Sequence, residues 1–234
     1  MKNGKTLAAL LLALTVSFGL CACGGQSDST SGAKTDIKAE TGAENLSDTL
    51  VYAGENESTI NPVLSSHDEI VELVFSGLMK YDGNGIAVPD LAESCEYDEA
   101  TCTYTFHLKN GVKWHDGEAF TAKDVVFTYQ VLTEDETLTS SVTSNYEDIT
   151  DITAPDDETV VITLDKYCAN MPGYFTIGII PRHLLEGEDM QESDFFRHPV
   201  GTGPYKLADW EEGQAITLEK NVDYFQGEPN IDTI

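Results

Sequence analysis

Basic residues are scarce in this chain of 234 residues, where 13 lysines and arginines stand against 41 aspartates and glutamates. The formal net charge of -28 repels nucleic acid phosphates, so we exclude nucleic acid as a partner. Repulsion between molecules of the same sign also favours a monomer. The acidity has two interpretations, a solvated surface or an attraction for cationic solutes, and it does not predict the charge of a ligand.

The motifs of the commonest secreted hydrolases and nucleotide-binding proteins are absent. The chain has no Gly-x-Ser-x-Gly elbow, His-Glu-x-x-His helix, Walker loop or Rossmann fingerprint. The segment 201–205 is only superficially similar to a phosphate loop, because Pro204 follows its second glycine and favours a tight turn. His115 and Asp116, with His107 eight residues earlier, match no standard metal spacing. We therefore expect no catalysis, no cofactor and no metal.

No apolar run is long enough for a permanent transmembrane helix. The mostly apolar residues 7–20 would extend over about 21 Å as a helix, short of the roughly 30 Å hydrocarbon layer. Lys2 and Lys5 precede this run, and small residues follow it. This order predicts a secretion signal over residues 1–23.

The end of the signal resembles a bacterial lipobox. Leu20 stands three positions before Cys23 and small Ala22 stands directly before it, whereas Cys21 follows bulky Leu20. The resemblance implies that Cys23 becomes the lipidated N-terminus and holds the protein at the outer face of the cell membrane. The alternative is an ordinary secreted protein cut nearby. Residues 24–48, rich in Gly, Ser, Thr, Ala, Lys and Glu, predict a flexible linker.

The remaining residues alternate between strand and helix patterns. Apolar residues at helical spacing after Ser66 and after Thr121, each with an acidic residue three positions later, predict helices over about 67–76 and 121–132. Alternating residues predict hairpins that pair 95–97 with 102–109 and 148–153 with 159–164. Further strands are expected at residues 50–52, 177–180, 205–210 and 216–219. The predicted class is α+β with mixed sheets.

Cysteine is sparse, and three of the five cysteines lie in the globular part. Cys95 and Cys102 flank a hairpin turn in a compartment where disulfides persist, so a bridge between them is one alternative and two free thiols are the other. If they pair, Cys168 is left free, buried or both.

Three ordered landmarks resemble family 5 solute-binding proteins, the oligopeptide, dipeptide and nickel receptors of ABC importers. The first contains Asn61-Pro62, Gly77-Leu78, Tyr81-Asp82 and the run VPDLAES at residues 88–94; the second is YTFHLKNGVKWHDGEAFTAKDVVFTY at 104–129; the third is PVGTGPY at 199–205, followed by 218–219 and 221–224. Together the landmarks extend over nearly all of residues 50–234.

The resemblance implies a bilobed fold, here a lobe like that of type II periplasmic binding proteins with an inserted subdomain. Residues 49–70 and 178–234 would belong to the first lobe, and residues 71–177 would form the insertion. Relatives are about twice as long, so we expect a fragment or a truncated product that stops before the second lobe. Because such receptors enclose solute by hinge closure, we also expect weak binding or none from this chain alone.

The family implies an extracytoplasmic receptor that delivers short peptides to the permease subunits of an importer. Nickel, haem and sugar receptors of the same family stay open as alternatives, as do a sensory or adhesive surface lipoprotein and a lipid-anchored hydrolase. The residues that would face the ligand are the loop after the first strand and an apolar wall: Asn61, Val63, Leu64, Ser65, His67, Met171, Tyr174 and Phe175. For each of them, ordinary packing or capping is the competing interpretation.

Overall fold

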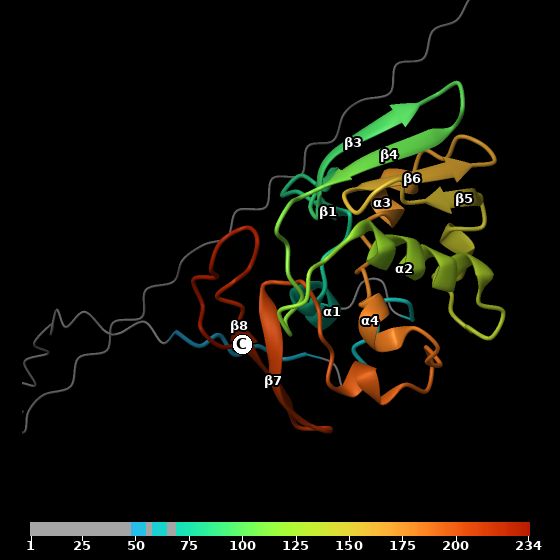
Figure 1. Ribbon diagram of the computed structural model, residues 1–234. Helices are drawn as coiled ribbons and strands as arrows, with labels where there is room; N and C mark the ends of the chain where they lie inside the picture. Colours follow the sequence, from blue (N-terminus) through green and yellow to red (C-terminus); the bar gives the residue numbers. More distant parts are fainter. Residues whose placement is uncertain (1–47, 55–57, 65–68) are drawn as a thin grey trace, which may run out of the picture. The chain divides into compact units, whose positions relative to one another are not determined.

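The computed structural model of the protein describes residues 48–54, 58–64 and 69–234 (Figure 1). The predicted signal, its lipidation site Cys23 and nearly all of the predicted linker lie outside the described residues, as do Ser65 and His67. The helices are α1 Glu69–Val74, α2 Ala122–Glu134, α3 Met171–Tyr174 and α4 Arg182–Leu185, with 3-10 turns at Thr143–Asn145 and Asp194–Arg197. The strands are β1 Met79–Tyr81, β2 Ala87–Pro89, β3 Ala92–Asp98, β4 Thr103–Leu108, β5 Ile149–Thr153, β6 Thr159–Leu164, β7 Tyr205–Glu211 and β8 Ala215–Lys220.

A four-stranded antiparallel sheet in the order β3-β4-β6-β5 is the largest element of structure (Figure 1). Both predicted hairpins are present, and β6 pairs with β4, which joins them into one sheet. Along β4 the side chains of Tyr104, Phe106 and Leu108 are buried while His107 between them is exposed. This alternation gives the sheet one face for the core and one for water.

Helix α2 forms where the pattern predicts it, and hydrogen bonds of Asp124 in its first turn connect it to neighbouring segments. The Asp124 carboxylate accepts the backbone N–H of Thr121 at 2.9 Å, which completes the predicted capping box. Its second oxygen accepts the N–H of Arg182 at 3.1 Å, at the start of α4. One buried carboxylate therefore caps α2 and also fixes α4 beside it.

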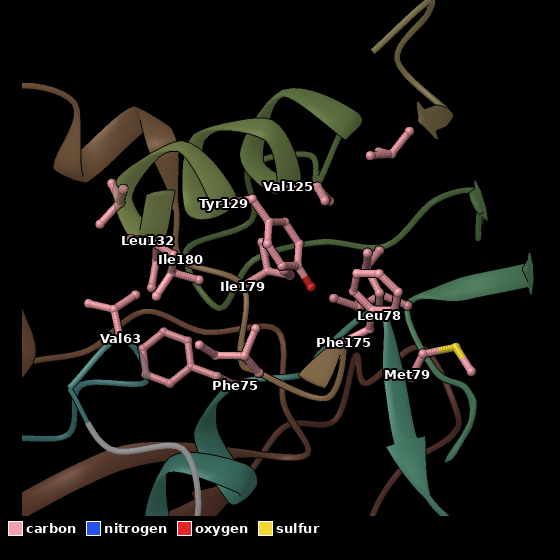
Figure 2. Close-up of a cluster of buried hydrophobic side chains, with 14 of the residues drawn as sticks. Val63, Phe75, Leu78, Met79, Val125, Tyr129, Leu132, Phe175, Ile179 and Ile180 are labelled. Atoms are coloured by element: carbon pink, nitrogen blue, oxygen red, sulfur yellow. The ribbon is translucent and has the colours of Figure 1, made fainter. Parts of the chain in front are cut away.

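The core gathers between α2 and the buried face of the sheet. Figure 2 shows Tyr129 and Val125 of α2 directed toward Phe175 and Leu78. Phe175 lies at the centre of the aromatic packing: its ring centroid is 5.0 Å from that of Tyr104, and its ring also packs edge-on against Phe106 and Tyr129. Such edge-to-face pairs stabilise a core beyond the area they bury.

The strand expected at residues 177–180 does not form, although the segment is buried as a strand would be. The N–H of Ile179 donates to the carbonyl of Ser76, and the N–H of Ile180 donates to the hydroxyl of Thr128. Because these partners lie just after α1 and within α2, the backbone N–H groups are satisfied without a strand ladder. Figure 2 shows both isoleucine side chains in the core.

The hairpin β7-β8 forms a separate two-stranded sheet with neighbours from both ends of the described chain. Thr49 forms a parallel bridge with Thr233, and Thr233 forms an antiparallel bridge with Glu219 of β8. The strand expected at residues 50–52 is reduced to the bridge at Thr49 and the hydrogen bond from Leu50 N–H to the Thr233 carbonyl. The predicted α+β class is therefore present, with antiparallel ladders and one parallel bridge among the described residues.

The proposed bridge between Cys95 and Cys102 is not made. Cys95 lies opposite Phe106 in the β3-β4 register, four positions along the chain from Cys102, or roughly 13 Å at about 3.3 Å per residue. That separation exceeds the reach of a disulfide, which needs Cα atoms within about 7 Å. Cys95, Cys102 and Cys168 are all free thiols.

Candidate functional site

The second and third sequence landmarks meet at the imidazole of His115. The ring Nδ1 accepts the N–H of Gly201 at 3.1 Å, and Nε2 lies 3.0 Å from the carbonyl oxygen of Gly203. These two contacts require the neutral ring with its proton on Nε2, because only that tautomer accepts at Nδ1 and donates at Nε2. Burial, followed by the nearby Lys206 ammonium among the lowering causes, brings the His115 pKa down to about 4. His115 is therefore a neutral link between two loops.

The glycines of the third landmark allow the backbone to approach α1. A methyl group added at Gly201 would lie 1.8 Å from the carbonyl oxygen of Val74, and one added at Gly203 would lie 2.5 Å from that of Leu73. The N–H of Gly203 donates to the Val74 carbonyl at 2.8 Å. The Gly-x-Gly spacing thus serves close backbone packing at the end of a helix, as the turn interpretation of 201–205 predicts.

A buried carboxylate joins the first landmark to the segment directly after the third. Asp90 forms an ion pair with Lys80 of β1 at 3.3 Å, and its carboxylate also accepts from the side-chain amide of Gln226. Burial raises the pKa of Asp90, and the Lys80 charge opposes that rise. Within the third landmark, the side-chain amide of Asn221 donates to the Gly203 carbonyl at 3.1 Å. All three landmarks therefore belong to one connected unit.

The residues predicted to follow the first strand are mostly enclosed by the protein. Asn61 is fully buried, donates to the Met190 carbonyl at 2.7 Å and accepts the N–H of Val63 at 3.0 Å. Val63 is also fully buried, whereas Leu64 is half-buried. Here Asn61 holds two loops together, and its side-chain oxygen and nitrogen each have a protein partner. Their contact with a ligand stays a prediction.

The predicted apolar wall lies around α3. Met171 and Phe175 are fully buried, and Tyr174 is half-buried. The Tyr146 hydroxyl donates to the Tyr174 carbonyl at 2.7 Å, which fixes the end of the helix. Leu64 and Tyr174 are thus the described members of the predicted set that retain exposed surface, and they come from different parts of the chain.

A cavity of about 410 Å³ lies elsewhere, beside the β7-β8 hairpin. Leu50, Val51 and Tyr52 line it together with Ile70, Trp210 and Ile216. Val51 is 86% exposed, which is unusual for an apolar residue in a strand-like segment. Sequence reasoning missed this cavity, and the signal in the sequence was the apolar run at residues 50–52 directly after the predicted linker.

The part of the chain that the structure describes contains neither a metal-binding cluster nor a membrane-spanning helix. No group of three or more His, Cys, Asp or Glu side chains in that part is arranged to hold a metal ion. His183 and Asp116 form a pair at 2.8 Å without a third ligand. Within the same residues no helix has the length and apolar character needed to cross a bilayer.

Comparison with known proteins identifies the family. Residues 87–234 match the model of bacterial extracellular solute-binding proteins, family 5. The oligopeptide-binding protein AppA of Bacillus subtilis is 35% identical over 247 aligned residues, an alignment that includes 100% of this chain and 44% of the relative.

Two solved structures superpose closely on the described fold. NikZ of Campylobacter jejuni, in complex with Ni(L-His), has a TM-score of 0.76 at 37% identity over 80% of this chain and 38% of its own. AppA of Bacillus subtilis, in complex with a nonapeptide, has a TM-score of 0.71 at 34% identity over 76% of this chain and 37% of its own. These neighbours confirm the expected type II periplasmic-binding-protein class.

The match is partial in one respect: the chain spans less than half the length of these relatives. Within that span the expected landmarks, the fold class and the family model agree. The chain belongs to the family 5 bacterial extracellular solute-binding proteins.

Proposed function

We propose that this chain acts in the capture of short peptides outside the cytoplasm, for delivery to the permease of an ABC importer, and that it is not an enzyme. Membership of family 5 carries the proposal. Peptides are favoured over other solutes because AppA of Bacillus subtilis, a relative aligned with the whole of this chain, is an oligopeptide-binding protein. Nickel is the second candidate, because NikZ superposes with a TM-score of 0.76 and was solved with Ni(L-His).

Peptide uptake by living cells tests the ligand. Deleting the gene should lower uptake of labelled di- and oligopeptides, and restoring it should recover that uptake, while uptake of free amino acids stays unchanged. A deletion strain with normal peptide uptake and reduced nickel uptake would transfer the assignment to nickel. If the deletion strain took up both peptides and nickel normally, the proposed transport role would be refuted.

The lipid anchor is a separate part of the proposal. Its support is the position of Leu20 and Ala22 before Cys23 in the sequence. Cells fed an alkyne-labelled fatty acid should label the wild-type protein and the Cys21→Ser variant, and both should sediment with membranes. The Cys23→Ser variant should lose the label and remain in the soluble extracytoplasmic fraction. Equal labelling of the two variants would refute lipidation at Cys23.

The division into lobes also stays a proposal, with residues 49–70 and 178–234 in the first lobe and 71–177 inserted. It is supported by the grouping of strands, since the four-stranded sheet lies within 92–164 whereas the β7-β8 sheet pairs with Thr49 and Thr233. In this division the ligand would contact Leu64 from the first lobe and Tyr174 from the insertion. Leu64→Ala and Tyr174→Ala should each reduce peptide uptake at unchanged protein level, whereas Ile86→Ala, at an exposed position in the β1-β2 turn, should not.

A further inference from the structure

Two free thiols, Cys102 and Cys168, and three phenols lie at the turn end of the β3-β4 hairpin. Tyr97 of β3 faces Tyr104 of β4 with ring centroids 4.5 Å apart, and Tyr167 packs on Tyr97 at 5.9 Å. Cys102 lies in the turn, and burial followed by the nearby Cys102 thiol raises the pKa of Tyr97 to about 12. Cys168 directly follows Tyr167, so its backbone lies next to this cluster of three tyrosine rings. Neither the predicted fold nor the proposed function requires these thiols.

Pairing within the sheet brings the two segments together at this end. The N–H of Leu164, the last residue of β6, donates to the Cys102 carbonyl at 2.9 Å, so Cys102 continues the β4-β6 ladder. The chain then turns over residues 165–167 and returns toward α3, and the Met171 N–H donates to the Cys168 carbonyl. Cys102 and Cys168 therefore both lie at this end of the hairpin, near the phenol of Tyr104.

The electrostatics of Tyr104 agree with this arrangement. Its pKa rises to about 12 through burial and then through Cys95, Tyr167, Cys168 and Cys102, all of which lie close enough to disfavour a phenolate. Cys95 differs from the other two thiols because burial raises its own pKa to about 11. A thiol with that pKa holds almost no thiolate at neutral pH, and the thiolate is the reactive form.

The backbone at Cys102 is a further indication. Its φ of 53° is the one left-handed value at a non-glycine position among the described residues. Asn or Gly would adopt this conformation at lower cost, so the turn itself does not favour a cysteine.

We propose that Cys102 and Cys168 form a disulfide that fastens the β3-β4 turn to the segment between β6 and α3. Formation removes two protons and two electrons from the thiols and transfers the electrons to a small-molecule disulfide, which is reduced to two thiols. In the cell this inference rests on the proposed export, because disulfides persist outside the cytoplasm. The chemistry itself is tested on purified protein, so its failure is separate from a failure of the proposed function.

The test is oxidation of the full 234-residue chain with oxidised glutathione, followed by peptide mapping without reduction. Trypsin leaves Cys95 and Cys102 on one peptide, since no Lys or Arg lies between Lys80 and Lys109. A second digestion with a glutamate-specific protease separates them at Glu96 and Glu99. The expected product joins the Cys102 peptide to the Cys168 peptide, with two hydrogens lost.

Matched variants complete the design. Cys95→Ser should keep the cross-link, whereas Cys102→Ser and Cys168→Ser should each abolish it. Oxidation should raise the Tm of the wild type and of Cys95→Ser by roughly 5–15 °C, because the closed loop is long, and should leave the Tm of the other two unchanged. During oxidation, thiol labelling of the folded protein should show that Cys102 and Cys168 lose their reactivity toward the label at the same rate. A dominant bond to Cys95, Cys21 or Cys23, or no bond within one chain, would overturn the proposal.

Discussion

Replacing His115 by glutamine should remove a large part of the acid sensitivity of the fold. Burial lowers the His115 pKa from the ordinary 6.5 to about 4, so the folded protein holds the neutral ring while the unfolded chain binds a proton below pH 6.5. The resulting stability is complete above pH 6.5 and is lost as the pH falls toward 4. Between pH 7.5 and pH 5 this one group should cost about 2 kcal/mol of unfolding free energy.

Urea unfolding at pH 7.5, 6 and 5, followed by tryptophan fluorescence, measures this effect. His115→Gln keeps an amide donor for the Gly203 carbonyl but does not titrate, so its unfolding free energy should change about 2 kcal/mol less than that of the wild type between pH 7.5 and 5. At pH 7.5 the variant should be less stable by about 1–2 kcal/mol, because the Gly201 N–H loses its acceptor. His107→Gln, at an exposed position on β4, is the control and should follow the wild type. If the unfolding free energy of the wild type and of His115→Gln fell by the same amount between pH 7.5 and 5, the neutral state of His115 in the folded protein would be refuted.

Three further substitutions test the packing of the landmarks and the core. Gly201→Ala should cost roughly 3 kcal/mol in urea unfolding, because the added methyl overlaps a backbone carbonyl, whereas Gly83→Ala meets nothing within 4 Å and should change stability little. Asp124→Ala should cost about 2–4 kcal/mol, since two backbone N–H groups lose their acceptor, while exposed Asp157→Ala should stay within about 0.5 kcal/mol. Phe175→Ala should lower unfolding free energy by about 3–5 kcal/mol, and a cost below 1 kcal/mol would contradict its central place in the core.

Local sequence patterns predicted where helices and strands form, but they did not predict which distant segments these elements contact. The alternation around Phe106 and the capping box at Thr121 predicted a strand and a helix, and both form where expected. These features depend on neighbours within a few residues, so a single sequence contains them. The prediction of a strand at residues 177–180 was wrong, because the backbone of this segment forms hydrogen bonds with Ser76 and Thr128, which are distant in the chain.

At the candidate site, too, the sequence did not predict which distant residues would be in contact. Asn61 was predicted to face the ligand, with ordinary packing as the competing interpretation, and its side-chain amide donates to the carbonyl of Met190, 129 residues away. The choice between a Cys95–Cys102 bridge and two free thiols was open for a similar reason, since only the register of β3 on β4 decides which residues face each other. No local pattern specifies such partners.

By itself the sequence determined the acidic surface, the family landmarks, the α+β class and the export signal that we predict, because each depends on composition or on residues that are close in the chain. Only the tertiary structure decided that His115 is a neutral link between Gly201 and Gly203 and that Asp90 is bound by Gln226. The physical reason is that burial and hydrogen bonding between distant segments set a side chain's charge, tautomer and exposure.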